Sequence, residues 1–198
     1  MPRRQLHYHA RVTYVILGLL HITHMSLYDL IKAFEAGASL FYGASAGSIK
    51  RALDKLLEEG AVRVGRQEPG VRGRREYSVT SLGTQKFEAW MRQEPRGDFD
   101  STAVARLYFL GLMPPDERSA ILARIQERAL SDLNRLELVE QEARSTEVPD
   151  RFQDVGRFQQ AALNYGLSSM RHTYDWFTTF RAEQSQHEER RSEHEESE

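Results

Sequence analysis

The feature that most constrains the fold is a change of hydrophobic period at Gly60. Residues 44–64, ASAGSIKRALDKLLEEGAVRV, begin with small side chains and continue with apolar residues at helical spacing. Four of these apolar residues fall on one face of a helix, namely Ile49, Leu53, Leu56 and Leu57. Beyond Gly60 the apolar side chains alternate, with Val62 and Val64 two residues apart. This transition predicts an amphipathic helix that begins near Ser45, ends at Gly60 and leads directly into a β-strand.

Two more helices are predicted before this one. Residues 11–22, RVTYVILGLLHI, carry apolar side chains at a helical period and follow a polar, basic arm at residues 1–10. In the next segment Ser26 lies three residues before Asp29, a spacing typical of a capping box, and an apolar run continues from there to Gly37. The chain is therefore expected to begin with three consecutive helices.

A β-hairpin and a fourth helix are predicted next. Residues 61–67 and 74–80 are two short β-branched runs, and the segment between them, EPGVRG, contains a proline and two glycines that favour a turn. Residues 81–91 return to a helical period. The side chains that this helix is expected to bury are Leu82, Phe87 and Trp90. The order α-α-α-β-β-α is that of a winged helix-turn-helix, in which a hairpin follows the third helix.

The second half of the chain is predicted to be helical. After an interruption at EPRGDFDS, a short apolar helix covers residues 103–113, and a helix of about eight turns begins at the prolines of PPDERS. In this long helix, apolar residues recur every seven positions, which is typical of a coiled coil. They are Leu122, Ala129, Leu136 and Ala143. A last long helix is expected to begin after Pro149.

That last helix carries two apolar stripes. The first consists of Val155, Phe158, Ala162, Tyr165, Ser169, His172 and Trp176. The second consists of Leu163, Leu167, Met170, Tyr174 and Phe177. Two apolar stripes need two partners, so we expect one to pack on the preceding helix and the other on a second subunit. The sequence does not decide which stripe takes which partner. We assign the dimerisation contact to the second stripe.

These elements predict a mainly α chain with a small β-hairpin wing. We place a winged helix-turn-helix domain with a basic arm at residues 1–94. A helical, antiparallel, coiled-coil-like domain for dimerisation and effector binding follows at residues 95–183. Residues 184–198 are charged and nearly devoid of apolar side chains, so they are predicted to be a disordered tail.

The charges of the chain are unevenly distributed. Residues 1–80 contain 12 Lys and Arg against 7 Asp and Glu, whereas the remainder contains 15 against 22. This imbalance favours a polyanionic partner for the first part, although chance segregation of surface charge is the alternative. The chain has no cysteine, which excludes disulfides, Cys-based zinc sites and thiol catalysis and predicts a cytoplasmic location. Its longest apolar run, roughly a dozen residues, is too short to span a membrane.

No local signature of catalysis is present, so we expect neither an enzyme nor a bound cofactor. The chain lacks the glycine patterns that cradle nucleotides, the G-x-S-x-G elbow and the H-E-x-x-H helix. His21 and His24 lie three residues apart without a convergent carboxylate, so no metal site is predicted. His172 is expected to be a packed histidine. Five aromatic residues either line a pocket for a flat apolar effector or form plain packing, and they are Tyr165, Tyr174, Trp176, Phe177 and Phe180.

The outward face of the third predicted helix is small or cationic in its first two turns, whereas its acids, Asp54 and Glu58, come mainly later. This pattern suits a helix that enters a DNA major groove end-on, although an ordinary solvated face is the alternative. The residues assigned to the groove are Ser45, Ser48, Lys50, Arg51 and Lys55. Those assigned to phosphates are Arg66, Arg72, Arg74 and Arg75 on the hairpin and Arg3 and Arg4 on the arm. An ion pair with Glu76 or Glu68 is an alternative role for Arg75.

Residues from about 13 to 90 resemble the DNA-binding domain of the PadR family of transcriptional regulators, which is named for repressors of phenolic acid decarboxylase. Three segments carry the resemblance in order, and they are ILGLLHITHMSLYDLIKAF, GSIKRALDKLLEEGAV and GRREYSVTSLG. The rest of the chain resembles the helical C-terminal domain of the longer, virulence-activator-like members. This second resemblance is less specific, since long amphipathic helices resemble one another.

The resemblance implies a homodimeric winged-helix repressor that binds a palindromic DNA operator and is released by a small, often aromatic or drug-like effector. The chain departs from the family at Lys50, where a Tyr hydroxyl usually contacts the DNA backbone. An ammonium still meets a phosphate there, with less geometric definition, so the family's site preference is in doubt. The alternatives are a winged-helix module that binds protein, a transcriptional activator, and a helical protein that sequesters a ligand.

Overall fold

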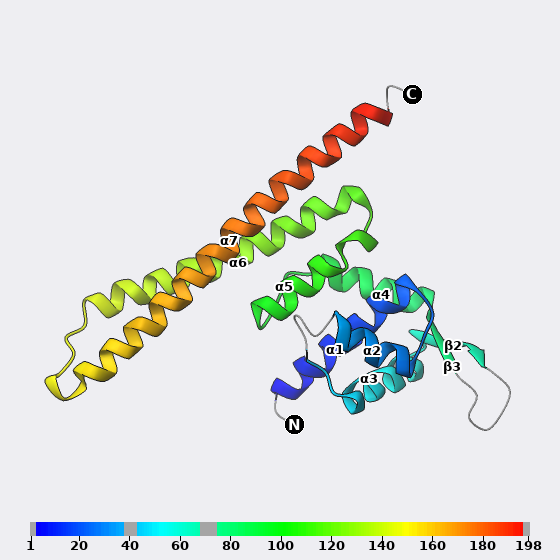
Figure 1. Cartoon of the computed structure of the whole chain (residues 1–198), viewed down its shortest axis with the longest axis horizontal. Coiled ribbons are helices and arrows are strands. Elements are labelled where there is room, and N and C mark those ends of the chain that lie inside the picture. Colours follow the sequence, from blue (N-terminus) through cyan, green and yellow to red (C-terminus); the bar gives the residue numbers. More distant parts are fainter. Residues whose placement is uncertain (1–2, 38–42, 68–74, 196–198) are drawn as a thin grey trace. The chain divides into compact units, whose positions relative to one another are not determined.

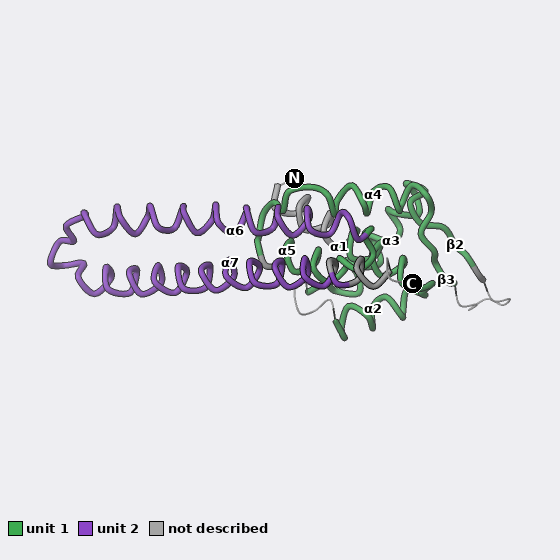
Figure 2. The backbone as a smooth tube through the Cα atoms, turned by 90° about the horizontal axis from the view of Figure 1, so that it is seen from above, with its two compact units in different colours: residues 1–114 green, residues 115–198 purple. Residues whose placement is uncertain are grey.

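A computed structural model of the chain describes residues 3–37, 43–67 and 75–195. The chain is mainly helical and divides into two compact units, residues 1–114 and 115–198 (Figure 1, Figure 2). The helices and strands of the first unit are α1 (Arg3–Ile22), β1 (Met25–Ser26), α2 (Leu27–Ala36), α3 (Ala46–Glu58), β2 (Val62–Gln67), β3 (Arg75–Val79), α4 (Ser81–Arg92), α5 (Phe99–Tyr108) and the short 3₁₀ helix η2 (Leu110–Leu112). Those of the second unit are α6 (Pro115–Arg144), the 3₁₀ helix η3 (Asp150–Phe152) and α7 (Gln153–Glu195).

The first three helices form where local sequence signals predict them. Helix α1 buries its predicted apolar stripe from Val12 to Leu20, but it begins at Arg3, so the predicted arm is part of this helix. Ser26 and Asp29 form the predicted capping box at the start of α2. The Ser26 N–H donates to Asp29 Oδ2 at 2.9 Å, and the Asp29 N–H donates to Ser26 Oγ at 3.3 Å. The predicted stop is also confirmed, because Gly37 caps the end of α2.

Replacing Ser26 by alanine is expected to lower the free energy of unfolding by about 1 kcal/mol, since the first turn of α2 loses its side-chain acceptor. Urea denaturation followed by circular dichroism measures this change. Threonine keeps the hydroxyl, so Ser26→Thr is the matched control and is expected to lose less. An alanine variant as stable as the parent would mean that the capping box contributes nothing.

In the described part of the chain, three strands form one antiparallel sheet in the order β1-β3-β2. The predicted hairpin is confirmed, with Val62 opposite Val79 and Val64 opposite Tyr77. Strand β1 was not predicted, because it has only two residues and pairs with β3 far along the chain. The pairing register shifts between Val64 and Gln67, as it does at a β-bulge. The hairpin follows α3 after three residues, which is the order of a winged helix.

Helices α4 and α5 complete the core of the first unit. Of the three α4 side chains predicted to be buried, Phe87 and Trp90 are buried, whereas Leu82 is exposed. The Phe109 ring lies edge-on to Phe87 at a centroid distance of 5.9 Å. Its atoms also lie where a Cβ on Gly18 would stand, so α1 accepts this ring only because residue 18 has no side chain. The core therefore extends beyond the winged helix into residues that follow it.

Helix α5 is held to α4 by a buried arginine. Arg106 donates from Nη2 to the Trp90 carbonyl at 3.0 Å and from Nη1 to the Thr102 carbonyl at 2.9 Å. Its guanidinium lies 4.4 Å from the centre of the Trp90 ring, and burial lowers the pKa of Arg106 to about 10. Because α5 packs here, the division between the units falls after Pro114 and differs from the predicted boundary at residues 94 and 95.

The second unit is an antiparallel pair of long helices, with α6 and α7 side by side (Figure 2). Gln126 of α6 hydrogen-bonds Thr178 of α7 at 2.8 Å, and Glu137 pairs with Arg171 at 3.0 Å, so the helices run in opposite directions. Asp132 interrupts the apolar seam of α6 and is buried. Its carboxylate is bonded by Arg128 at 2.8 Å and Arg135 at 3.3 Å, which compensates for the loss of water.

The predicted disorder of residues 184–198 is wrong for most of that segment, because α7 continues to Glu195. The segment contains neither proline nor glycine, and its glutamates and arginines favour helix despite their charge. Along the described ranges, none of the helices combines the length and apolar character needed to cross a bilayer.

Candidate nucleic-acid interface

Helix α3 is positioned by a cap at its start and an apolar face along its length. Ser45 is the N-cap residue, and its Oγ accepts the Ser48 N–H at 3.2 Å. The predicted inward residues Ile49, Leu53 and Leu56 are buried, and Leu57 is half-buried. The predicted bounds are also confirmed, since α3 begins at Ala46 and the chain turns at Gly60, whose φ of 69° favours glycine.

The prediction that Ser48 faces outward is wrong. Only 3% of this residue is exposed. Its Oγ donates to the Ser45 carbonyl at 2.8 Å, so the hydroxyl completes the cap. Ser48 also lies one turn before Ala52, which is buried on the same side. Ser45 itself is exposed and stays on the candidate surface.

The three predicted cations of α3 are all exposed, but they differ in their partners. Lys50 donates from Nζ to Asp54 Oδ2 at 2.6 Å, and Lys55 pairs with Glu59 at 3.7 Å. Arg51 has no ion-pair partner among the residues that the structure describes. Its Nη1 lies 3.6 Å from the place where a Cβ on Gly47 would stand. The guanidinium therefore extends toward the start of the helix, over a residue without a side chain.

The end of α3 is tied to α4 through Glu59. This carboxylate accepts a hydrogen bond from Lys86 Nζ, which lowers the pKa of Glu59, and the nearby ammonium of Lys55 acts in the same direction. Lys55, Glu59 and Lys86 also line a cleft of about 280 Å³, together with Thr13, Tyr14, Ala89 and Gln93. The pair between Glu59 and Lys86 links the end of α3 to α4.

On the hairpin, the structure shows two exposed arginines, one that was predicted to contact phosphate and one that was not. Arg75 lies at the start of β3 and is exposed, with no ion pair to Glu76 in the described part of the chain. Sequence analysis missed Arg63, which is exposed on β2 and donates from Nε to Ser78 Oγ at 3.2 Å. Its place between Val62 and Val64 was a usable signal, because strand side chains alternate between faces.

Five predicted phosphate contacts lie wholly or partly outside the described residues. Arg72 and Arg74 fall outside the described residues, in the segment 68–74 between β2 and β3. Arg66 is part of β2, and Arg3 and Arg4 are part of α1, but the side chains of these three residues are not among those described. Their assigned roles stay predictions.

The two histidine expectations have different outcomes. His21 bonds the Leu17 carbonyl through Nδ1 at 2.7 Å and Thr84 Oγ1 through Nε2 at 3.2 Å. Because a carbonyl only accepts, Nδ1 carries the proton, and Nε2 is already occupied by the threonine hydroxyl. His172, by contrast, is exposed, so its expected packing is wrong. Within residues 3–37, 43–67 and 75–195, no three His, Asp or Glu side chains form a group that could hold a metal ion.

In the second unit, the two stripes of α7 have opposite environments. The stripe assigned to dimerisation faces α6 of the same chain: Leu167 and Phe177 are buried, and Leu163, Met170 and Tyr174 are half-buried. Because this stripe is covered within one chain, the packing disfavours that assignment, and the dimerisation contact stays a prediction. The exposed stripe is the first one, in which Phe158 is 66% and Tyr165 78% exposed. The two stripes lie roughly 130° apart around the helix, so one helix cannot cover both.

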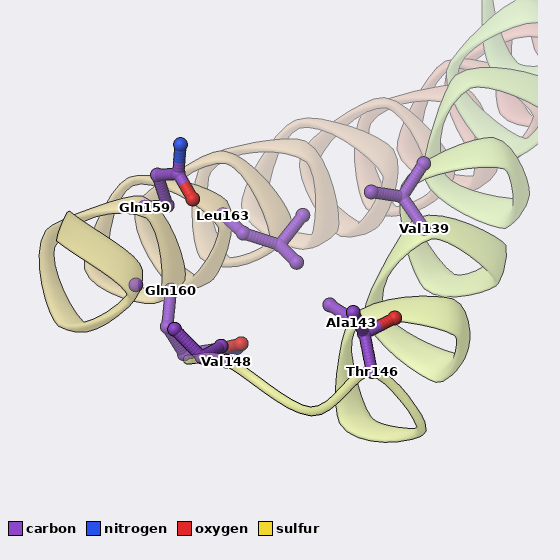
Figure 3. A pocket seen from close by; sticks show the side chains of 8 residues that line it. Val139, Ala143, Thr146, Val148, Gln159, Gln160 and Leu163 are labelled. Carbon is purple, nitrogen blue, oxygen red and sulfur yellow. The ribbon is translucent and has the colours of Figure 1, made fainter. Parts of the chain in front are cut away.

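A cavity of about 330 Å³ lies near the turn between α6 and α7 (Figure 3). Figure 3 shows Leu163 and Val139 pointing toward one another across it, with Gln159 and Gln160 on the α7 side. The remaining lining residues are Ala143, Thr146, Val148 and Gly156. None of the five aromatic residues considered for an effector pocket lines this cavity.

Comparisons with known proteins agree with this organisation. Residues 101–184 match the family described as "Virulence activator alpha C-term". The negative transcriptional regulator PadR of Bacillus subtilis (strain 168) is 29% identical over 126 residues, which cover 61% of this chain and 69% of PadR.

Solved structures of Bacillus subtilis PadR are also similar. The complex with operator DNA has a TM-score of 0.40 and 21% identity, covering 87% of this chain and 98% of the other. The complex with p-coumaric acid has a TM-score of 0.40 and 21% identity, covering 89% and 97%. The match over residues 101–184, the sequence relationship to PadR and the winged-helix order of the first unit agree, and together they support a PadR-like family of transcriptional regulators for this chain.

Proposed function

We propose that this regulator binds double-stranded DNA at an inverted-repeat operator as a homodimer and represses transcription there. The observation that carries the proposal is the exposed face of α3, where Lys50, Arg51 and Lys55 stand on a helix directly followed by a hairpin with further exposed arginines. We include in the proposal a small aromatic or drug-like effector that releases the DNA, as the family resemblance implies. An activator has the same contacts, because the sign of regulation depends on where the operator lies.

The start of α3 suits the major groove. Gly47 is exposed and has no side chain, so the helix approaches base edges closely at this point. Asp54 and Glu58 lie farther along, where the helix leaves the groove, and Asp54 is neutralised by Lys50. In a helix-turn-helix, the N-terminal residues of the recognition helix contact the bases. The acids therefore lie away from the end that enters the groove.

The hairpin suits the phosphate backbone. Arg75 and Arg63 are exposed cations on its two strands, and the predicted contacts Arg66, Arg72 and Arg74 fall between them in the sequence. Contacts of this kind release counterions, so they strengthen binding to any sequence and make it depend on salt.

The open stripe of α7 suits a second copy of this chain. It extends from Val155 to Trp176, about 32 Å along a helix, which is a long apolar surface for a single chain to leave uncovered. A two-fold axis through such a stripe pairs it with itself. Two recognition helices held about 34 Å apart would then match successive major grooves.

Replacing Arg75 by alanine is expected to weaken binding to operator and random duplexes alike. The slope of log affinity against log salt should fall by about 0.9 for each phosphate that the protein no longer neutralises. The measurement is fluorescence anisotropy with an operator obtained by selecting bound fragments from the source genome. Arg124→Ala removes the same charge from an exposed position on α6 and is expected to leave the slope unchanged. Equal slopes for Arg75→Ala and the parent would remove Arg75 from the interface, and a parent without salt-dependent DNA affinity would refute the proposed function.

A further inference from the structure

We infer that Arg51 is the residue of α3 that reads base identity, and that the base it reads is a guanine in each half-site. This inference rests on the proposed DNA binding and adds the chemistry of its specificity. It is carried by the different states of the three exposed cations on one helix face.

Lys50 and Lys55 are already engaged with carboxylates of the same region. Lys50 Nζ lies 2.6 Å from Asp54 Oδ2, and Lys55 lies 3.7 Å from Glu59, which Lys86 holds from α4. An ammonium beside a carboxylate presents little net charge and fewer free donors. An ammonium is also a point charge, which defines no planar pair of acceptors. These two lysines are therefore suited to adjustable phosphate contacts rather than to base recognition.

Arg51 is in the opposite state. No carboxylate pairs with it in the described part of the chain, so its guanidinium keeps its five N–H donors for a ligand. The side chain extends over Gly47, one turn nearer the start of the helix, where Nη1 lies 3.6 Å from the position of an absent Cβ. This is the end of the helix expected to enter the groove. A flat, charged fork is thus placed where base edges would lie.

The fork selects guanine among the four bases. In the major groove guanine presents two acceptors, O6 and N7, at the spacing of two guanidinium N–H groups. Adenine offers N7 beside an amino donor that repels the second N–H, and cytosine offers an amino donor. Discrimination by such a bidentate pair corresponds to about a 5- to 150-fold change in affinity.

The test replaces each guanine of the selected operator, one at a time, by 7-deazaguanine, which lacks the N7 acceptor. The parent protein is expected to lose affinity about 5- to 150-fold at one guanine in each half-site. Arg51→Ala should show no further loss at that guanine, and Arg51→Lys should lose the preference while keeping its affinity for random duplex. Lys50→Ala removes a charge from the neighbouring position and is the matched control, since it should weaken all duplexes equally and keep the guanine preference.

Two results would overturn the inference while leaving DNA binding intact. In one, Arg51→Ala weakens operator and random duplex equally, which makes Arg51 a phosphate contact. In the other, every 7-deazaguanine costs the Arg51→Ala protein as much as the parent. A parent protein that shows no salt-dependent affinity for any duplex would instead refute the proposed function and the inference with it. Circular dichroism of each variant establishes that α3 is still folded.

Discussion

Replacing Gly83 by alanine is expected to destabilise the first unit by about 3 kcal/mol, because the new methyl group would overlap the backbone of a neighbouring segment. A Cβ at residue 83 would stand 2.1 Å from the Ala61 carbonyl oxygen and 2.7 Å from Val79 Cγ2. That carbonyl already accepts the Thr80 N–H at 3.0 Å, and Thr80 caps α4. Relief of the overlap therefore requires the first turn of α4 to move away from its own cap.

The overlap also affects function, because Ala61 joins α3 to β2. A displaced α4 would change how the hairpin leaves α3, so the variant is expected to bind DNA less tightly even under conditions where it is folded. Urea denaturation measures the stability. Gly111→Ala is the matched control, since nothing lies within 4 Å of a Cβ there, and its change is expected to stay below about 1 kcal/mol. A Gly83→Ala protein as stable as this control would show that the close approach of α4 to Ala61 is not required.

Most predictions that rested on local chemistry are confirmed by the structure. Ser26 with Asp29, Gly37 and Gly60 each act within one helical turn, so their effect is contained in a few neighbouring residues. The apolar face of α3 was predictable for the same reason, since helical spacing decides which side chains share a face. These local signals were sufficient to predict the three helices and the hairpin of the winged helix.

Predictions that depended on distant contacts were less reliable. Strand β1 is stabilised by pairing with β3, about fifty residues farther along the chain, and two residues carry no pattern of their own. The interruption at residues 94–101 ends α4 but not the unit, since Phe99 and Phe109 return to its core. Composition alone does not reveal such a return.

The candidate site shows the same division. The helical period predicted that Lys50, Arg51 and Lys55 are exposed. Their ion pairs were not predictable, because these depend on side-chain rotamers and on the position of α4. Ser48 was misplaced because it lies one turn before the buried Ala52, at the edge of the apolar face, and its hydroxyl bonds the carbonyl of the cap residue. Both stripes of α7 are largely apolar in sequence, and packing against α6 shows which of them is covered within the chain.

The exposed stripe of α7 leads to the second large effect. Changing Phe158 and Tyr165 together to aspartate is expected to make the chain monomeric at micromolar concentration, since two charges would be buried in each copy of a self-paired contact. Affinity for the inverted-repeat operator should then fall by about 10²-fold or more, because the second half-site is no longer bound by a linked module. Light scattering after size-exclusion chromatography measures the mass, and fluorescence anisotropy measures DNA affinity.

A matched pair of substitutions separates the contact from the added charge. Asn164→Asp with Ser168→Asp adds two acids to exposed positions of the same helix, roughly 110° around from the stripe. This control is expected to remain a dimer and to keep its operator affinity. Neither pair of substitutions changes Leu167 or Phe177, which are buried in the helix pair. A difference in mass between the two proteins would therefore report the subunit contact and not unfolding of the helices. If the Phe158 and Tyr165 variant stays dimeric, the subunits meet through another surface, and the exposed aromatic stripe needs a different partner.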